Sequence, residues 1–178
     1  SKVLEMGCGY GDGLSPFLLS DFRVNNLTGI DLMPARLEIA KKRLPGANFL
    51  HLSGQDMKGI ENNSYDLVIE QFAFCHIPSE ELKRKIASEM LRVLKPNGFI
   101  IILDWRISWK SRNIYGPSYS FLRDIFKEGE LTEKILILKT YLWPNIGNFI
   151  SKFCLPLYPI FLSIPLLMGA RYVVFQKK

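Results

Sequence analysis

Cysteine and histidine are scarce in this sequence of 178 residues, which contains three of the first and two of the second. Cys8, Cys75 and Cys154 lie far apart and form neither a CxxC pair nor the spacing of metal ligands. Neither a disulfide framework nor a structural zinc site is therefore indicated. Isolated cysteines of this kind are typical of reduced, buried thiols in a cytoplasmic protein. We expect a protein without a metal ion.

Charged residues are missing from 153–170, a run long enough to be a candidate membrane span. Pro156, Pro159 and Pro165 would interrupt a spanning helix, and a crossing would separate the end of the chain from the strands before it. We expect the apolar insert 145–169 to form a lid over a binding pocket, a face for peripheral membrane contact through 153–170, or further helices over the core. The predicted location is cytoplasmic, with or without that membrane contact.

Positive charge exceeds negative charge, with 23 lysines and arginines, 17 acidic residues and a net charge of +6. The basic residues are scattered in the clusters 41–43, 83–85, 110–112 and 177–178. A nucleic-acid-binding surface would need these clusters on one face, with stacking aromatic side chains. We interpret them as solvated helix faces, so nucleic acid is not the expected partner. An anionic membrane or a phosphorylated substrate stays open.

Length and composition indicate one domain, 1–178, because 48% of the residues are hydrophobic and can fill a sizeable core. The sequence enters its first predicted strand directly after Ser1 and Lys2. We therefore expect an N-terminal helix to lie outside this sequence. The oligomeric state is not indicated.

The most informative stretch is the glycine loop 7–13, in which every second residue is glycine. It follows a short buried strand predicted at 3–6 and precedes the apolar run 14–19, which is predicted to be helical. Glycines allow positive φ angles and let a ligand approach the main chain closely, and a helix start presents unpaired N–H groups. The segment therefore predicts a binding loop for a nucleotide-like ligand.

The spacing of the glycines distinguishes two kinds of ligand. A dinucleotide-binding loop follows the pattern G-x-G-x-x-G, whereas here Glu5 leads the evenly spaced Gly7, Gly9 and Gly11. A nicotinamide-dependent oxidoreductase is therefore disfavoured. A second predicted buried strand ends in Asp31, and an acid at this place in doubly wound folds accepts hydrogen bonds from ribose hydroxyls.

Strands and helices alternate through the rest of the chain, as in a doubly wound α/β fold. Helices are predicted at 34–44, after the cap residue Ser79 and at 120–127, and strands at 49–52, 65–70, 99–104, 133–142 and 171–176. A turn is predicted at 96–98 and a polar and aromatic connection at 107–119. Continuous apolar strands such as 99–104 are typical of parallel strands that are buried on both faces.

Three parts of the sequence carry a resemblance to a known family. The first is the glycine loop with its leading acid, Glu5-Met6-Gly7-Cys8-Gly9-Tyr10-Gly11. The others are Tyr65-Asp66-Leu67-Val68 with His76-Ile77-Pro78, and Leu91-Arg92-Val93-Leu94-Lys95-Pro96-Asn97-Gly98. In this order they resemble motifs of the class I S-adenosylmethionine-dependent methyltransferases, and the resemblance covers residues 2–104 closely. It implies a Rossmann-like, doubly wound sheet of seven strands in the order 3-2-1-4-5-7-6. The last strand is then antiparallel, and helices cover both faces.

The resemblance also implies S-adenosylmethionine as the cofactor and divides the chain into a cofactor-binding half, 1–105, and an acceptor side, 106–178. In the family the loop wraps the methionine and ribose parts, and the acid after the second strand binds the ribose. The apolar pair after that acid, here Leu32 and Met33, lies beside the adenine. The residues expected to bind the cofactor are Glu5, Gly7, Cys8, Gly9, Gly11, Asp31, Leu32, Gln55, Asp56 and Glu70.

The chain departs from the family pattern after the third strand, where members commonly have an acid that binds the adenine amino group. Gly54 stands at that position, and Asp56 follows two residues later. We expect Gln55 and Asp56 to line the adenine pocket on a shifted loop. The alternative is a plain surface turn.

His76 is the only histidine expected at the mouth of the site, where it is a candidate base if the acceptor must lose a proton. A packing or helix-capping role is the alternative. Glu70, Asp104 and Trp105 end the fourth and fifth strands, where ligands of open α/β sheets bind. Such chemistry depends mainly on proximity and orientation, since the sulfonium methyl is already activated.

Together these expectations describe a methyltransferase that acts on a small-molecule acceptor or on a lipid- or glycan-linked one. The apolar insert resembles those of methyltransferases acting on lipid, quinone or glycan precursors, which favours a small or lipid-linked acceptor. Two alternatives stay open. One is a catalytically silent S-adenosylmethionine-binding partner subunit, and the other is an RNA methyltransferase, which would need the basic clusters on one face.

Overall fold

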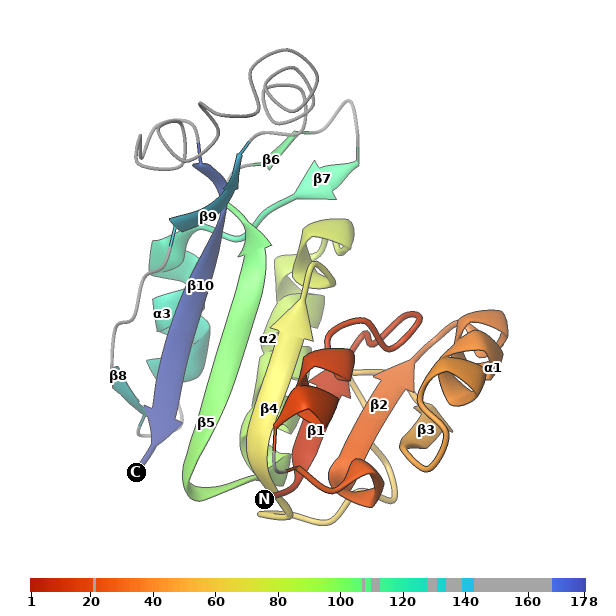
Figure 1. The fold of residues 1–178 in the computed structure, drawn as a ribbon. Coiled ribbons are helices and arrows are strands. Elements are labelled where there is room, and N and C mark those ends of the chain that lie inside the picture. The colour runs from red at the N-terminus through yellow and green to blue at the C-terminus, as the bar shows by residue number, and fades with distance from the viewer. Residues whose placement is uncertain (21, 107, 110–112, 128–130, 134–138, 143–167) are drawn as a thin grey trace.

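The computed structural model describes residues 1–178 except 21, 107, 110–112, 128–130, 134–138 and 143–167, and it shows a central mixed sheet with helices on both faces (Figure 1). The strands of this sheet run in the order β3-β2-β1-β4-β5-β10-β8, and β9 also pairs with β10. They are β1 Val3–Met6, β2 Leu27–Asp31, β3 Asn48–His51, β4 Tyr65–Gln71, β5 Leu94–Trp105, β8 Leu131–Glu133, β9 Lys139–Leu142 and β10 Met168–Lys177.

Parallel pairing joins β3, β2, β1, β4 and β5. All four residues of β1 are buried, as expected for the central strand of a parallel sheet. β10 lies antiparallel between β5 and β8. The predicted order 3-2-1-4-5-7 with an antiparallel last strand is therefore confirmed.

The sixth strand differs from the prediction of one element at 133–142. The structure has two short strands, β8 and β9, which both pair antiparallel with β10. β8 pairs with the end of β10, and β9 pairs with its start. The two short strands therefore line the same edge of one long strand. Residues 134–138 between them lie outside the described residues.

Helices α1 Pro34–Arg43, α2 Glu80–Val93 and α3 Tyr119–Lys127 lie close to their predicted positions. α2 begins at the predicted cap, where the Oγ of Ser79 accepts a hydrogen bond from the amide N–H of Leu82. Its apolar stripe includes Ile86, Met90 and Val93, which are all buried. Burial of this stripe fixes α2 against the sheet.

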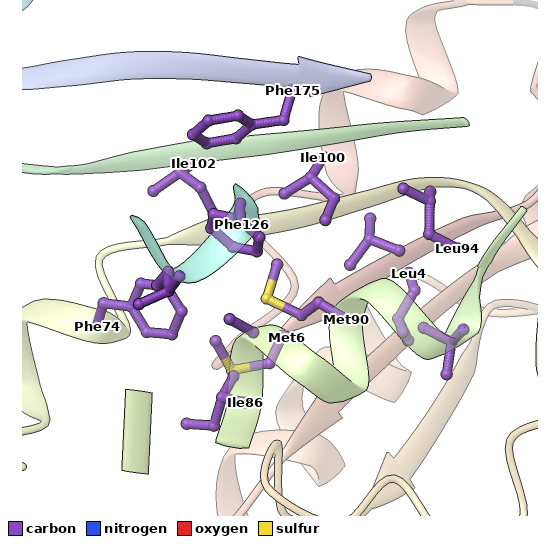
Figure 2. Close-up of a cluster of buried hydrophobic side chains, with 14 of the residues drawn as sticks. Leu4, Met6, Phe74, Ile86, Met90, Leu94, Ile100, Ile102, Phe126 and Phe175 are labelled. Atoms are coloured by element: carbon purple, nitrogen blue, oxygen red, sulfur yellow. The ribbon is translucent and has the colours of Figure 1, made fainter. Parts of the chain in front are cut away.

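Two clusters of buried side chains form the core, one on each face of the sheet. On one face Ile86 and Met90 of α2 and Phe126 of α3 pack against strand side chains that include Leu4, Met6, Ile100, Ile102 and Phe175 (Figure 2). On the other face Leu37 and Ala40 of α1 and Leu14 after the glycine loop pack with Val3, Leu27, Phe49 and Ile69 of the strands. The predicted helices on both faces are confirmed.

The segment after the glycine loop is a short 3-10 helix, η1 Ser15–Leu19, rather than the helix predicted over 14–19. Leu14 is buried, but Leu18 and Leu19 are 44% and 92% exposed. The run therefore has no continuous apolar face to bury, and burial of such a face is what stabilises most helices in proteins. A second 3-10 helix, η2 Val24–Asn26, leads into β2.

β5 begins at Leu94, directly after α2, rather than at 99. The predicted turn 96–98 is an irregularity in the pairing with β4, and Asn97 has a φ of 63°. A Cβ at Gly98 would lie 2.9 Å from the carbonyl oxygens of Asp66 and Lys95. Glycine is needed here because two backbone segments approach each other closely.

The connection after β5 contains a hairpin that the sequence did not predict, in which β6 Ser108–Trp109 pairs antiparallel with β7 Ile114–Tyr115. Of the apolar insert 145–169, residues up to 167 lie outside the described residues, so its role stays a prediction. Within the described ranges, no helix is both long and apolar enough to cross a membrane. Cys8 and Cys75 are buried and free, as predicted, and Cys154 is not described.

Candidate active site

The carboxyl ends of β1, β2, β4 and β5 meet at one edge of the sheet because these strands are parallel. The glycine loop 7–13 follows β1, Asp31 ends β2, a turn at 72–76 follows β4, and Trp105 ends β5. Ligands of open α/β sheets bind at this edge. The structure therefore brings the predicted binding loop, the predicted ribose-binding acid and His76 to the same edge.

The glycine loop has a backbone conformation that other residues rarely adopt. Gly7, Gly9 and Gly11 have φ angles of 71°, 53° and 80°. The amide N–H groups of Gly7 and Cys8 both donate to the carbonyl of Ile30, each at 2.9 Å, which ties the loop to β2. A Cβ at Gly9 would meet no atom within 4 Å. Gly9 therefore faces open space, where a ligand can approach the main chain.

Asp31 is only 7% exposed, and both of its carboxylate oxygens accept hydrogen bonds from the backbone. Oδ2 accepts from the N–H of Gly9 at 2.9 Å, and Oδ1 accepts from the N–H of Met33 at 2.8 Å. A carboxylate has about four lone-pair sites, so acceptor capacity is left for ribose hydroxyls. Asp31 thus also holds the glycine loop, which the sequence did not predict.

Glu5 lies beneath the glycine loop, is 2% exposed, and has no hydrogen-bond partner at Oε2. Its Oε1 occupies the space that a side chain at Gly13 would need. Burial raises the pKa of Glu5 to about 8, the carboxylates of Asp12 and Asp31 add to this, and the backbone amide of Leu14 opposes it. The carboxyl group therefore binds a proton up to neutral pH.

Asp12 and Asp31 place negative charge around the glycine loop, whereas the buried Glu5 is protonated up to neutral pH. Asp12 is paired with Arg43 at 2.6 Å on the surface. Within the described part of the chain, no lysine or arginine forms an ion pair with Glu5 or Asp31. A site of this charge suits a ligand that carries positive charge.

The residues predicted to lie beside the adenine are exposed at the carboxyl ends of β2 and β3. Leu32 and Met33 are 63% and 50% exposed, although they follow a buried strand. Gln55 and Asp56 are exposed in a turn in which the N–H of Asp56 donates to the carbonyl of Ser53 at 3.1 Å. All four are accessible to a ligand, and their contact with adenine stays a prediction.

Gly54 replaces the acid of the family pattern for a reason of packing. A Cβ at this position would lie 3.0 Å from Cγ and Sδ of Met6 and 3.4 Å from Cγ2 of Ile86. A side chain at this position would therefore require Met6 and Ile86 to shift within the core. The turn 53–56 instead lies close against the sheet.

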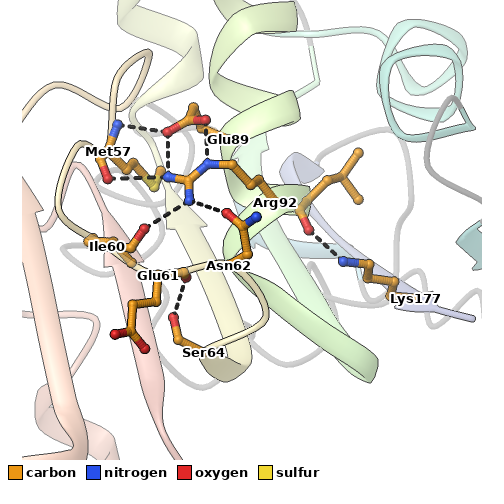
Figure 3. Close-up of polar contacts among 9 residues, drawn as sticks. Met57, Ile60, Glu61, Asn62, Ser64, Glu89, Arg92 and Lys177 are labelled. Atoms are coloured by element: carbon orange, nitrogen blue, oxygen red, sulfur yellow. Dashed lines mark hydrogen bonds and ion pairs between the residues drawn. The ribbon is translucent and has the colours of Figure 1, made fainter.

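Arg92 of α2 anchors the loop that follows this turn (Figure 3). Its guanidinium donates to the carbonyls of Met57 at 3.2 Å and Ile60 at 2.8 Å, and it pairs with Glu89 at 2.7 Å. Glu89 in turn accepts a hydrogen bond from the N–H of Met57 at 2.8 Å. The pair thereby fixes the chain directly after the turn 53–56.

An Arg92→Met variant is expected to lose about 2 kcal/mol of unfolding free energy, because two carbonyls and the Glu89 carboxylate lose a charged donor. Chemical denaturation measures this loss. Lys85→Met is the matched control on the same helix, since its ion pair with Glu81 is solvent-exposed and such pairs contribute little to stability. Equal effects of the two substitutions would contradict the anchoring role.

The turn 72–76 begins with a residue in an unfavourable conformation. Phe72 has a φ of 54°, in the left-handed region that bulky side chains rarely adopt. Its ring packs at a tilt against that of Trp105, with the ring centroids 5.3 Å apart. His76 is exposed at the end of the 3-10 helix η3, Phe74–His76. Two aromatic rings and a histidine therefore stand at the carboxyl ends of β4 and β5.

The structure does not bring the side chains of Glu70 and Asp104 to the ligand-facing surface. Their exposed fractions are 0% and 1%, and their carboxylates accept hydrogen bonds from the backbone of the turn 72–76. Burial raises the pKa of both groups, that of Asp104 to about 6. Trp105, in contrast, is partly exposed.

The sequence did not single out three residues of this region as functional. Arg92 lies inside the segment 91–98, which resembles a family motif, and this resemblance was the only indication that Arg92 matters. Ala73 lies close to the glycine loop, because a Cβ at Gly7 would be 2.7 Å from the Cβ of Ala73. This closeness follows from the pairing of β1 with β4, which the predicted strand order contains. No local pattern predicts a left-handed conformation for a phenylalanine such as Phe72.

Comparison with known proteins identifies the family. A methyltransferase domain matches residues 4–102, which is more than half of the chain. The chain belongs to this methyltransferase domain family. The matched range contains the glycine loop, Asp31, the turn 72–76 and Arg92.

Two curated relatives of this methyltransferase domain are similar over different lengths. The phthiotriol/phenolphthiotriol dimycocerosates methyltransferase of Mycobacterium leprae is 32% identical over 114 residues, which are 61% of this chain and 39% of that protein. A ubiquinone/menaquinone biosynthesis C-methyltransferase of Campylobacter jejuni is 25% identical over 156 residues, which are 85% of this chain and 65% of that protein. The chain thus spans less than two thirds of either relative.

The methyltransferase domain also has the fold of solved methyltransferases. A S-adenosylmethionine-dependent methyltransferase from Archaeoglobus fulgidus superposes with a TM-score of 0.73 at 16% identity, over 99% of this chain and 86% of that one. Family and fold imply S-adenosylmethionine as the cofactor. The site fits this cofactor, because Gly9 leaves open space and the carboxylates beside the loop suit its sulfonium and ammonium charges.

The basic clusters of the methyltransferase domain do not form one surface in the described part of the chain. Residues 41–43 lie on α1, and 83–85 lie on α2, on the opposite face of the sheet. Lys83 is itself buried. The RNA methyltransferase alternative required a single basic face, and these two clusters do not supply one.

Proposed function

We propose that this methyltransferase domain transfers a methyl group from S-adenosylmethionine to an apolar acceptor of the lipid or quinone class. The observation that carries the proposal is the aromatic pair Phe72 and Trp105 at the carboxyl ends of β4 and β5, the edge where open sheets bind ligands. The names of the two curated relatives support the same class of acceptor.

The chain's part in the reaction is to bind and orient, because S-adenosylmethionine supplies a sulfonium methyl that is already activated. In this proposal Asp31 accepts hydrogen bonds from the ribose hydroxyls, and Gly7, Gly9 and Gly11 let the ligand approach the backbone of the loop. Glu5 lies beneath the loop, and in this proposal the positive charge of the bound cofactor opposes the burial that raises its pKa.

The acceptor lies, in this proposal, against Phe72 and Trp105. Flat aromatic surfaces bind apolar and aromatic groups and exclude water from the reacting atoms. His76 ends the same turn and is exposed, so it can take a proton from an acceptor that must lose one. These roles for His76, Phe72 and Trp105 account for an aromatic turn next to a cofactor loop.

A transfer assay tests the acceptor class. The protein is incubated with S-adenosylmethionine labelled in its methyl group and, in parallel, with a prenylated quinol, a long-chain phenolic lipid, a small amine and transfer RNA. We expect the label in the quinol or the phenolic lipid. A Trp105→Ala variant should raise the KM for that acceptor about tenfold and leave the affinity for S-adenosylhomocysteine unchanged. Phe99→Ala, in the middle of β5, is the matched control.

Each other outcome overturns the proposal in a different way. Label in transfer RNA would support the RNA methyltransferase alternative, and label in the amine would support a small polar acceptor. Binding of S-adenosylhomocysteine without transfer to any of the four would support the silent partner subunit.

A further inference from the structure

Two buried carboxylates contact the turn 72–76, and the proposed function assigns neither of them a role. The turn starts with Phe72 in the left-handed region, and its N–H donates to the carbonyl of Leu103 at 2.8 Å. A strained residue persists only where the surrounding structure holds it firmly, and such residues gather at functional sites. The contacts that hold this turn therefore merit a functional explanation.

Glu70 holds the first half of the turn. Its Oε1 accepts hydrogen bonds from the N–H groups of Ala73 at 2.6 Å and Phe74 at 2.9 Å. The side chain has no exposed surface, and its Oε2 has no hydrogen-bond partner. Burial of such a group is costly, so an apolar residue at this position would pack more favourably if the contact had no further use.

Asp104 holds the second half. Its Oδ2 accepts a hydrogen bond from the N–H of Cys75 at 2.8 Å, and its Oδ1 accepts from the N–H of Trp105 at 2.6 Å. Glu70 pairs in register with Ile102, so Glu70 and Asp104 point to the same face of neighbouring strands. Three successive amides of the turn, 73–75, are thus bonded to carboxylates from two strands.

The held turn is in direct contact with the glycine loop. A Cβ added at Gly7 would lie 2.7 Å from the Cβ of Ala73, so Ala73 packs closely against the backbone of the loop at Gly7. On its other side the turn carries Phe72, whose ring packs on Trp105. The strained turn therefore lies against the cofactor loop through Ala73 and supplies one ring of the aromatic pair through Phe72.

We infer that Glu70 and Asp104 are positioning residues, which hold the turn 72–76 so that Ala73 supports the cofactor loop and Phe72 stays paired with Trp105. The inference rests on the proposed function in one respect, namely that the glycine loop binds the cofactor. It goes beyond that function because two side chains that do not face the ligand would affect both the cofactor loop and the pair Phe72 and Trp105.

The first test compares two replacements of Glu70. Glu70→Gln keeps an oxygen that accepts from Ala73 and Phe74, whereas Glu70→Met keeps the length of the side chain and leaves both amides without an acceptor. Calorimetric titration with S-adenosylhomocysteine should give a Kd within about twofold of the unchanged protein for glutamine and raised about tenfold or more for methionine. Asp104→Asn and Asp104→Leu should repeat this contrast.

Loss of stability alone must be separated from loss of position. Val93→Ala is the matched control, because Val93 is fully buried in the same core cluster at the far end of α2. It should destabilise the protein and leave the Kd unchanged. Amide hydrogen exchange in the absence of ligand gives a second readout, in which residues 73–75 should exchange about tenfold faster in Glu70→Met than in Val93→Ala.

A double-mutant cycle tests the contact between loop and turn. Gly7→Ala places a methyl group against Ala73 and is expected to weaken S-adenosylhomocysteine binding. Ala73→Gly removes the opposing methyl group, so the double variant should recover part of the lost affinity, and the two effects should not add. Additive effects would show that the turn does not support the loop.

The inference is overturned if Glu70→Met binds S-adenosylhomocysteine as tightly as Glu70→Gln and residues 73–75 keep their protection from exchange. Failure of the unchanged protein to bind S-adenosylhomocysteine would instead contradict the assignment of the glycine loop. In that case the exchange measurement still decides whether Glu70 and Asp104 hold the turn.

Discussion

An Asp31→Asn variant is expected to bind S-adenosylhomocysteine about a hundredfold more weakly than the unchanged protein. The loss arises because charge-assisted hydrogen bonds to the ribose become neutral or are lost, at about 1.5 kcal/mol each. The amide oxygen of asparagine can still accept a hydrogen bond from the N–H of Gly9 or Met33, but its NH2 group only donates, so the glycine loop keeps one of its two hydrogen bonds to this side chain.

Comparison with Asp31→Ala separates the two roles of this side chain. Alanine removes both hydrogen bonds to the loop and should lower the free energy of unfolding by about 2 kcal/mol more than asparagine does. Titration calorimetry and chemical denaturation measure the two effects, and Glu38→Gln on the surface of α1 is the control. Unchanged affinity in Asp31→Asn would remove this residue from the cofactor site.

A Glu5→Gln variant is expected to be more stable than the unchanged protein at pH 8 by about 3 to 5 kcal/mol, and nearly equal to it at pH 4. The buried carboxyl group has a pKa of about 8 in the folded state and an ordinary value of 4.5 when exposed. Between these two values the unfolded chain loses its proton and the folded chain keeps it, so stability falls as the pH rises. Glutamine does not titrate and is free of this loss.

Denaturation at several pH values between 4 and 8 measures the effect as a difference in slope. Glu70 and Asp104 also have raised pKa values, so the variant should keep part of the decline and lose the share of Glu5. Glu81→Gln is the control, because Glu81 is exposed on α2. Parallel curves for Glu5→Gln and the unchanged protein would mean that Glu5 is ionised in the folded state.

The parallel half of the fold could be predicted from the sequence because its signals are local. β1 is a short apolar run followed by a glycine, and β2 is a short apolar run that ends in an acid. The structure places them at Val3–Met6 and Leu27–Asp31, as predicted. α2 has a cap residue and an apolar stripe, so its start was predicted correctly. In each case propensity, periodicity and burial indicate the same structure.

The errors occur where the local signal and the tertiary structure disagree. The apolar run 14–19 lacks a buried face and forms only a 3-10 helix. The turn residues 96–98 were expected to end the connection after α2, yet the chain already pairs with β4 from Leu94. Pairing with a neighbouring strand cannot be predicted from local sequence. Because of this pairing, β5 begins at Leu94 and not at residue 99.

In the site, the sequence predicted which residues lie at the strand ends but not the direction of every side chain. Glycine loop, Asp31 and His76 meet at one edge as expected. Glu70 and Asp104 were expected to face a ligand because they lie at strand ends. Successive side chains along a strand point to opposite faces of the sheet. In the register observed for β4 and β5, the side chains of Glu70 and Asp104 lie on the same face, beneath the turn 72–76.

The position of β10 has a consequence for the order in which the molecule can assemble. β10 lies between β5 and both β8 and β9, and it supplies Val173 and Phe175 to the core. During synthesis β5 therefore remains a long apolar strand with one open edge until the residues after 167 emerge. Open edges of this kind pair readily with other chains. The half that holds the cofactor loop thus depends on the last strand for protection against aggregation.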